Sequence, residues 1–188
     1  MNNQIYLPAE DSFFMSECLS QIIPDLIKKN NNLKFLEIGS GSGINLETAS
    51  NLGIKKQNIF SSDINTKAVS RCRSLGFHCI KSDLFSRIPE NKFNIIIFNP
   101  PYLPEEDFEP EDSRISTTGG KKGNEIIIKF LRQAKNYLDN FGVILIITSS
   151  YSENITFKKL GYNSEKLSTK NLFFEKLFLW KLIPKKLQ

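Results

Sequence analysis

The stretch that decides the fold is FLEIGSGSG, residues 35–43. The short apolar run 34–38 predicts a buried strand, and the glycines that follow allow a tight turn and a close approach of backbone to a ligand. Residues 44–52 then predict a helix whose N-terminus points at that ligand. A strand, a glycine-rich turn and a helix in this order predict the first unit of a parallel α/β sheet with a ligand site at the turn.

The alternation of strands and helices continues along the chain. Further strands are expected at 58–62, 77–81, 93–98 and 142–148, and helices at 66–75 and 125–138. Upstream, Asp11 or Ser12 could cap a helix running to about Lys29, with Pro24 ending or kinking it early. Two last strands, 164–169 and 173–182, follow each other without a helix. We predict one α/β domain over residues 1–188, with a mostly parallel seven-stranded sheet, an antiparallel edge hairpin and helices on both faces.

The glycine spacing distinguishes between two kinds of ligand. The third glycine of the dinucleotide fingerprint G-x-G-x-x-G would fall at Ile44 or Leu46, so that fingerprint is not matched. The observed spacing is E-x-G-x-G-x-G, at Glu37, Gly39, Gly41 and Gly43. This loop is similar to that of Rossmann-like class I methyltransferases, which use S-adenosylmethionine. The carboxylate of Glu37 also suits a cationic sulfonium and ammonium ligand better than a pyrophosphate.

Two aspartates close the next two strands of the predicted sheet. Asp63 follows the second strand, where a carboxylate can accept hydrogen bonds from both ribose hydroxyls; capping of the following helix is the alternative. Asp83 follows the third strand, where residues of this class contact the adenine amino group, with Leu84 supplying a backbone N–H. A plain turn is the alternative for Asp83. Both positions lie where open α/β sheets bind ligands.

The segment Asn99-Pro100-Pro101-Tyr102 follows the apolar strand 93–98 directly. Two prolines there remove backbone donors and stiffen the turn, which a purely structural role does not require. The Asn99 side-chain oxygen and the Pro100 carbonyl can accept both hydrogens of a planar NH2 group. With its hydrogens held, the nitrogen can aim its lone pair at a methyl donor, while Tyr102 packs on the flat group. The motif predicts methyl transfer to an amide or amine nitrogen.

Together these motifs resemble the HemK-like family of N-methyltransferases. YLPAEDSF near the N-terminus, EIGSGSG, Asp63, SDLF, NPPY and TGGKKGNE occur in that family's order, over roughly residues 4–150. The match is most similar to the short eukaryotic and archaeal branch. The resemblance implies methylation of the glutamine side-chain amide in the GGQ motif of class-1 peptide release factors. It also implies a cofactor contact at Ser12 and a heterodimer with a small zinc-binding activator subunit.

The nature of the methyl acceptor stays open on the motif alone, because the exocyclic amine of adenine presents the same pair of donors. The loop LPEEDFEPED carries six carboxylates between Glu105 and Asp112. Next to an active site these would repel phosphates and attract a basic protein loop. We therefore expect a protein glutamine acceptor, with nucleic-acid adenine or another amine as the alternative, and a scaffold without activity as the remaining one.

Composition and charge agree with a chain that works in the cytoplasm. The formal net charge of +5 comes from lysines scattered in pairs rather than gathered in one stripe, so nucleic acid is not the expected partner. No stretch is long and apolar enough for a membrane span, and the N-terminus lacks a signal-peptide layout. Cys18, Cys72 and Cys79 fit no zinc spacing, so we expect reduced thiols and no metal.

Overall fold

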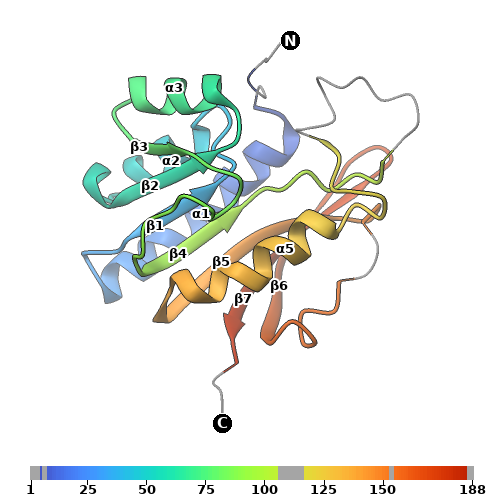
Figure 1. The fold of residues 1–188 in the computed structure, drawn as a ribbon. Coiled ribbons are helices and arrows are strands. Elements are labelled where there is room, and N and C mark those ends of the chain that lie inside the picture. The colour runs from blue at the N-terminus through green and yellow to red at the C-terminus, as the bar shows by residue number, and fades with distance from the viewer. Residues whose placement is uncertain (1–4, 6–7, 106–116, 153–154, 186–188) are drawn as a thin grey trace.

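The computed structural model describes residues 5, 8–105, 117–152 and 155–185. Its strands form one seven-stranded sheet in the order β3-β2-β1-β4-β5-β7-β6 (Figure 1). The strands are β1 (Phe35–Ile38), β2 (Ile59–Asp63), β3 (His78–Lys81), β4 (Phe93–Phe98), β5 (Leu138–Ser149), β6 (Tyr162–Asn171) and β7 (Lys176–Pro184). The helices are α1 (Glu10–Lys29), α2 (Ile44–Asn51), α3 (Thr66–Ser74) and α5 (Glu125–Ala134), with 3₁₀ turns η1 (Lys56–Asn58) and η2 (Lys135–Tyr137).

The sheet confirms the predicted α/β architecture. Strands β3, β2, β1, β4 and β5 pair in parallel, while β7 is antiparallel to both β5 and β6. The last two strands are therefore the predicted antiparallel hairpin, and β7 lies between β5 and the edge strand β6. Because the strand order reverses beside β1, the ends of β1 and β4 open the crevice where such sheets bind ligands.

Alternate residues of the central strands pack on opposite faces of the sheet. Phe35, Ile95 and Ile97 belong to a core covered by α1, α2 and α3, whereas Ile96 and Phe98 belong to a core covered by α5. The strands are buried on both sides, which explains why they read as unbroken apolar runs. Glu37 follows the period of Phe35 and so lies on the face of α1 and α2.

The N-terminal helix differs from the prediction in two respects. Ala9 is its N-cap and offers no side-chain hydrogen bond, whereas Asp11 and Ser12 lie inside the first turn and are buried, so the capping prediction was wrong. Pro24 lies within the helix, which continues to Lys29. The apolar face of α1, including buried Ile23, packs on the core and outweighs the hydrogen bond that proline removes.

The predicted helix 125–138 is too long, and the following strand begins earlier than expected. Leu138 already pairs with Phe93, and the register then shifts so that Ile95 pairs with Val143. A Cβ on Gly142 would lie 2.7 Å from the Phe93 carbonyl oxygen, so only glycine fits this irregularity. Sequence periodicity does not reveal such a shift.

No helix among the described residues combines the length and apolar character needed to span a bilayer. The three cysteines are buried and form no disulfide. In the part of the chain that the structure describes, no group of histidine, cysteine and carboxylate side chains could hold a metal ion.

Candidate active site

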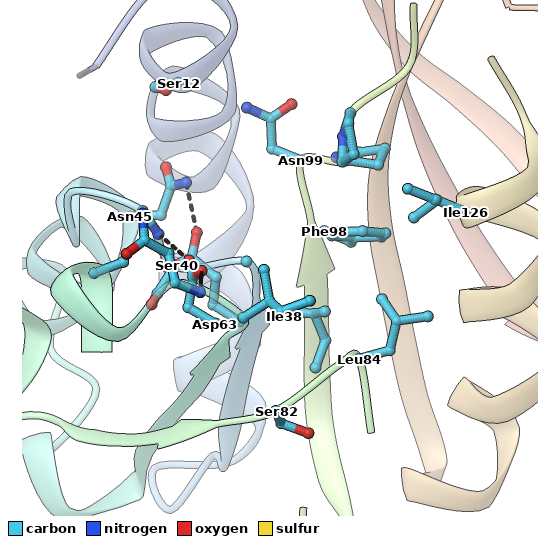
Figure 2. Close-up of a pocket in the computed structure, with 18 of the residues that line it drawn as sticks. Ser12, Ile38, Ser40, Asn45, Asp63, Ser82, Leu84, Phe98, Asn99 and Ile126 are labelled. Atoms are coloured by element: carbon cyan, nitrogen blue, oxygen red, sulfur yellow. Dashed lines mark hydrogen bonds between the residues drawn. The ribbon is translucent and has the colours of Figure 1, made fainter. Parts of the chain in front are cut away.

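A pocket of ≈ 380 Å³ opens at the carboxyl ends of β1, β2 and β4 (Figure 2). It is lined by most of the residues predicted from the sequence: Ser12, Glu37, Gly39, Gly41, Asp63, Asp83, Leu84, Asn99, Pro100 and Pro101. Its size is within the usual range for small-molecule sites. Gly43 and Tyr102 are not among the lining residues; Gly43 instead forms the N-cap of α2, at φ 88°.

One side of the pocket is a buried polar network that joins three elements. Asn45, at the start of α2, donates through Nδ2 to Oε1 of Glu37 at 2.8 Å. Its own Oδ1 accepts from the Ser16 hydroxyl of α1 at 2.9 Å. Because Asn45 is held from both sides, the Glu37 carboxylate is fixed at the end of β1.

The second carboxylate oxygen of Glu37, Oε2, makes no hydrogen bond within this network. Glu37 is 1% exposed, and its Oε2 has no hydrogen-bond partner in the structure. Burial raises the pKa of Glu37 well above its ordinary value, the hydrogen bond from Asn45 opposes the rise, and the charge of Asp63 adds to it. A buried carboxylate with a spare acceptor favours a cationic or N–H-donating group in the pocket.

Asp63 organises the glycine-rich loop. Its Oδ2 accepts from the backbone N–H of Gly41 at 2.8 Å, and its Oδ1 accepts from the N–H of Asn65 at 2.8 Å. Burial raises the pKa of Asp63, although these backbone N–H donors lower it. The cap of α3 is Asn65, whose side chain accepts from the N–H of Lys67, so Asp63 is not the helix cap. Its carboxylate oxygens keep acceptor capacity toward the pocket.

The other side of the pocket is apolar. Figure 2 shows Leu84, Phe98 and Ile126 opposite the polar group of Ser40, Asn45 and Asp63, with Ile38 between the two groups. Leu84 has a φ of 47° and is the only non-glycine residue at positive φ in the described chain. Such strain is tolerated where the surroundings hold it, and it is frequent at ligand sites. An apolar side of this kind suits packing against a flat aromatic ring.

Asp83 lines the pocket but is also engaged at the surface. Its Oδ2 accepts from the ammonium of Lys129 on α5 at 2.6 Å, and both side chains are about half exposed. This ion pair joins residues on separate elements, so no sequence pattern predicts it. Any ligand contact by Asp83 shares the carboxylate with Lys129.

Asn99 closes the pocket at the end of β4. Its Nδ2 donates to Oδ2 of Asp11 at 3.0 Å, while its Oδ1 is buried and has no partner in the structure. Pro100 and Pro101 line the pocket beside it and bring no backbone N–H. The end of β4 therefore places one unpartnered acceptor, the Oδ1 of Asn99, at the pocket.

The segment 118–123 packs against this turn, and its Thr118 lines the pocket. Leu103 forms a parallel bridge with Thr118, and the N–H of Gly119 donates to the Leu103 carbonyl at 2.8 Å. A Cβ on Gly119 would lie 2.7 Å from the Pro101 carbonyl oxygen, so its glycine allows the backbone to approach the motif. The side chain of Tyr102 packs against both cores, and its carbonyl accepts from the Ser152 hydroxyl.

Several lining residues were not predicted from the sequence. They include Asp11, Ser40, Asn45, Ser82, Phe98, Thr118 and Ile126. Asn45 comes two residues after Gly43, and this place beside the glycine loop was the signal in the sequence that could have identified it. Asp11 stands in the PAEDSF segment, where its place in the first helical turn suggested only a cap. The acidic loop up to Asp112 lies, apart from Glu105, outside the described residues.

Comparison with known proteins gives the relatives of this chain. Residues 19–178 match the family model described as Eco57I restriction-modification methylase. A candidate protein N5-glutamine methyltransferase of Methanocaldococcus jannaschii is 34% identical, over 97% of this chain and 94% of that protein. The eRF1 methyltransferase catalytic subunit of Schizosaccharomyces pombe is 31% identical, over 76% of this chain and 71% of that protein.

A solved structure supports the fold independently. One chain in the structure of the Mtq2–Trm112 complex of E. cuniculi aligns with this protein at a TM-score of 0.69 and 21% identity. The alignment covers 98% of this chain and 99% of that chain. The family model over residues 19–178 and relatives aligned over 71–94% of their own length show that the chain belongs to the Eco57I-type methylases and to the HemK-like N-methyltransferases of the eukaryotic and archaeal branch.

Proposed function

We propose that this chain transfers the methyl group of S-adenosylmethionine to the side-chain amide of glutamine in the GGQ motif of a class-1 peptide release factor. The observation that carries the proposal is the buried, unpartnered Oδ1 of Asn99 at the end of β4, beside two prolines. The names of the relatives supply the acceptor class, since they include glutamine and eRF1 methyltransferases.

The pocket fits the chemistry of the cofactor. The spare Oε2 of buried Glu37 would accept from the ammonium of the methionine moiety, and Asp63 would accept from the ribose hydroxyls. The apolar walls at Ile38 and Leu84 would take the adenine ring, with Asp83 near its amino group. Ser12, buried on α1, would contact the methionine end. Bound there, S-adenosylmethionine supplies an electrophilic methyl group on a sulfonium.

The acceptor nitrogen would be held by the chain itself. Asn99 Oδ1 and the Pro100 carbonyl would accept the two hydrogens of the glutamine amide, which frees the nitrogen lone pair to point at the methyl carbon. Positioning of this kind contributes up to roughly 7–11 kcal/mol in favourable systems. Pro101 stiffens the turn, and Tyr102 would flank the flat amide while its backbone ties the turn to Ser152. The methylated product can release its proton to water.

Adenine in nucleic acid is the second candidate acceptor. The matching family model, a restriction-modification methylase, favours it, because the exocyclic amine of adenine also offers two N–H donors. The six carboxylates between Glu105 and Asp112 favour a basic protein instead. Glutamine is the first choice for this reason and because the long alignments are with glutamine methyltransferases.

One experiment decides between the two acceptors. The chain, co-expressed with a small zinc-binding activator subunit, is incubated with radiolabelled S-adenosylmethionine and either a class-1 release factor or duplex DNA. We expect label on the release factor, and loss of that label when the GGQ glutamine is replaced. Label on DNA alone would contradict the glutamine assignment and support the adenine one.

An activator subunit would dock on the edge strand β3. Among the described residues the strand pairs only with β2, so its outer side offers backbone donors and acceptors to an added strand. Ser82 donates its N–H to Asp63 on β2, so by alternation the Lys81 N–H points outward. The related E. cuniculi protein was solved as a complex with Trm112. A heterodimer follows from this proposal, and a release-factor substrate would place it in the cytoplasm.

Replacing Lys81 by proline is expected to abolish co-purification of the activator, because it removes the outward N–H from the edge. Proline is tolerated at sheet edges, so the fold should persist. Lys81→Ala, which keeps the N–H, is the matched control and should retain the activator. Equal recovery of the activator with both variants, measured by size-exclusion chromatography, would rule out docking through this strand.

Replacing Asp63 by alanine is expected to weaken cofactor binding by roughly 10- to 150-fold. The reason is the loss of charged hydrogen bonds to the ribose, worth about 1.5–3 kcal/mol, together with release of the Gly41 N–H. Asp63→Asn keeps an acceptor for Gly41 and should lose less. The measurement is titration calorimetry with S-adenosylmethionine on variants that melt as cooperatively as the wild type. Unchanged affinity in Asp63→Ala would remove Asp63 from the site.

A further inference from the structure

We propose that Asp11 is a positioning residue for the methyl-transfer step. Its carboxylate fixes the rotation of the Asn99 side-chain amide so that the oxygen, and not the NH2 group, faces the methyl acceptor. The inference rests on the proposed function, since it concerns the same acceptor site. It assigns a role to a residue that the cofactor and acceptor contacts proposed above leave unused.

The need for such a residue follows from the shape of asparagine. Oxygen and nitrogen of its terminal amide are nearly equal in size, so rotation by half a turn exchanges an acceptor for a donor at almost no steric cost. In the rotated form Asn99 would present its own N–H bonds to those of the acceptor amide. Two donors facing each other repel, and the acceptor nitrogen would lose the partner that orients its lone pair.

The contact to Asp11 removes this ambiguity. Nδ2 of Asn99 donates to Oδ2 of Asp11 at 3.0 Å. A carboxylate only accepts hydrogen bonds, so the nitrogen of the amide must face Asp11. The Oδ1 of Asn99 is thereby directed away from Asp11, and it is buried without a partner in the structure. Figure 2 shows the Asn99 amide at the end of β4, opposite the turn of α1 that carries Ser12.

The Asp11 carboxylate is itself held in place. Asp11 is 7% exposed, and its Oδ1 accepts from the backbone N–H of Ser12 at 2.7 Å and from the Ser12 hydroxyl at 3.3 Å. The N–H groups of a first helical turn have no partner within the helix, and the helix dipole favours a negative group there. The start of α1 thus stabilises the carboxylate that orients Asn99, 88 residues along the chain.

The test compares two nearly isosteric substitutions on the same helix. Asp11→Asn keeps the shape of the side chain but can donate as well as accept, so Asn99 can take either rotation. We expect kcat on a class-1 release factor, assayed with the co-expressed activator, to fall about 100-fold. A small misplacement of reacting groups lowers the rate of a chemical step by about this factor. The Kd for S-adenosylmethionine and the melting temperature should stay near the wild-type values. Asp25→Asn, at an exposed site paired with Lys28, should change none of these.

A paired exchange separates positioning from a merely structural role. In Asn99→Asp alone, two carboxylates would face each other across the contact. When Asn99→Asp is combined with Asp11→Asn, the amide now on α1 can donate to the carboxylate now at the end of β4. Either oxygen of that carboxylate then offers an acceptor to the substrate. The double variant should therefore turn over at least about tenfold faster than Asn99→Asp alone. A double variant no faster than that single variant would contradict the proposal, as would wild-type kcat in Asp11→Asn.

A readout without turnover keeps this idea separate from the choice of substrate. The side-chain ¹⁵N–¹H₂ signals of Asn99, identified as the pair missing from Asn99→Ala, should shift or broaden in Asp11→Asn and stay unchanged in Asp25→Asn. If the signals respond but no release factor is methylated by the wild type, the proposed substrate fails and the orienting contact stands. If they do not respond, Asp11 does not orient Asn99.

Discussion

Replacing Asn99 by alanine is expected to lower kcat for methyl transfer by roughly 10²- to 10³-fold, the usual effect of removing a preorganised hydrogen-bonding group from a transition state. The side chain ends β4 with an unpartnered acceptor, and neither Pro100 nor Pro101 beside it has a side-chain oxygen that could replace it. The contribution appears mainly in the transition state, so affinity for S-adenosylmethionine should stay within about threefold.

A control on the same strand, Asn94→Ala, separates a loss of stability from a loss of catalytic activity. Asn94 of β4 donates to Asp139 at 3.1 Å and lies outside the pocket. Asn94→Ala should therefore lower the melting temperature while the folded enzyme keeps its kcat. Single-turnover methylation of the release factor measures the chemical step directly. A folded Asn99→Ala protein that methylates at a substantial rate would overturn the assignment of Asn99 as the acceptor-holding group.

Some features of the site follow from local spacing and were predicted from the sequence alone. All of them lie within three residues of the carboxyl end of a strand: Glu37, Gly39, Gly41, Asp63 and Asn99. The carboxyl ends of neighbouring parallel strands meet at one edge of a sheet, so a correct strand assignment is enough to bring these residues together. The fold follows from the same reasoning, because the buried apolar runs and glycine turns alternate with little ambiguity.

Contacts between elements that are far apart in the chain could not be predicted from the sequence. Asp11 meets Asn99 from a helix 88 residues upstream, and Lys129 of α5 meets Asp83. No spacing rule encodes either pair. At Pro24 a local rule is misleading. Proline is expected to end or kink a helix, but α1 continues to Lys29 because its apolar face packs on the core. The early start of β5 at Leu138 likewise depends on pairing with Phe93.

Glu37 gives the second large effect, and the effect has opposite signs in the free and the bound protein. With its Oε2 buried and unpartnered, the carboxylate disfavours folding of the cofactor-free chain. Replacing it by glutamine keeps an oxygen for Asn45 and removes the charge. We expect Glu37→Gln to raise the free energy of unfolding without cofactor by about 1–3 kcal/mol at neutral pH.

The pH dependence of that stabilisation follows from the raised pKa of Glu37. A carboxyl group whose pKa is higher in the folded protein binds its proton more tightly there. As pH rises above about 4.3, the ordinary value for glutamate, the unfolded chain loses this proton first, so the wild type loses stability. The loss continues until the pH passes the raised pKa. The gain of Glu37→Gln in urea denaturation should therefore be small near pH 4 and larger at pH 8.

The affinity for S-adenosylmethionine should change in the opposite direction, so Glu37→Gln should bind the cofactor more weakly. The ammonium that Glu37 would pair is drawn into a buried place, and removal of one partner of a buried ion pair costs about 3–5 kcal/mol, or roughly 150- to 4,000-fold in affinity. Glu47→Gln, at an exposed position of the neighbouring helix α2, is the control and should change neither stability nor affinity appreciably. If the cofactor-free variant is more stable than the wild type but binds the cofactor far more weakly, Glu37 strengthens cofactor binding and lowers the stability of the fold. A Glu37→Gln protein that binds with wild-type affinity would show that the spare oxygen faces no cation, and the ammonium would then have to be placed elsewhere in the pocket.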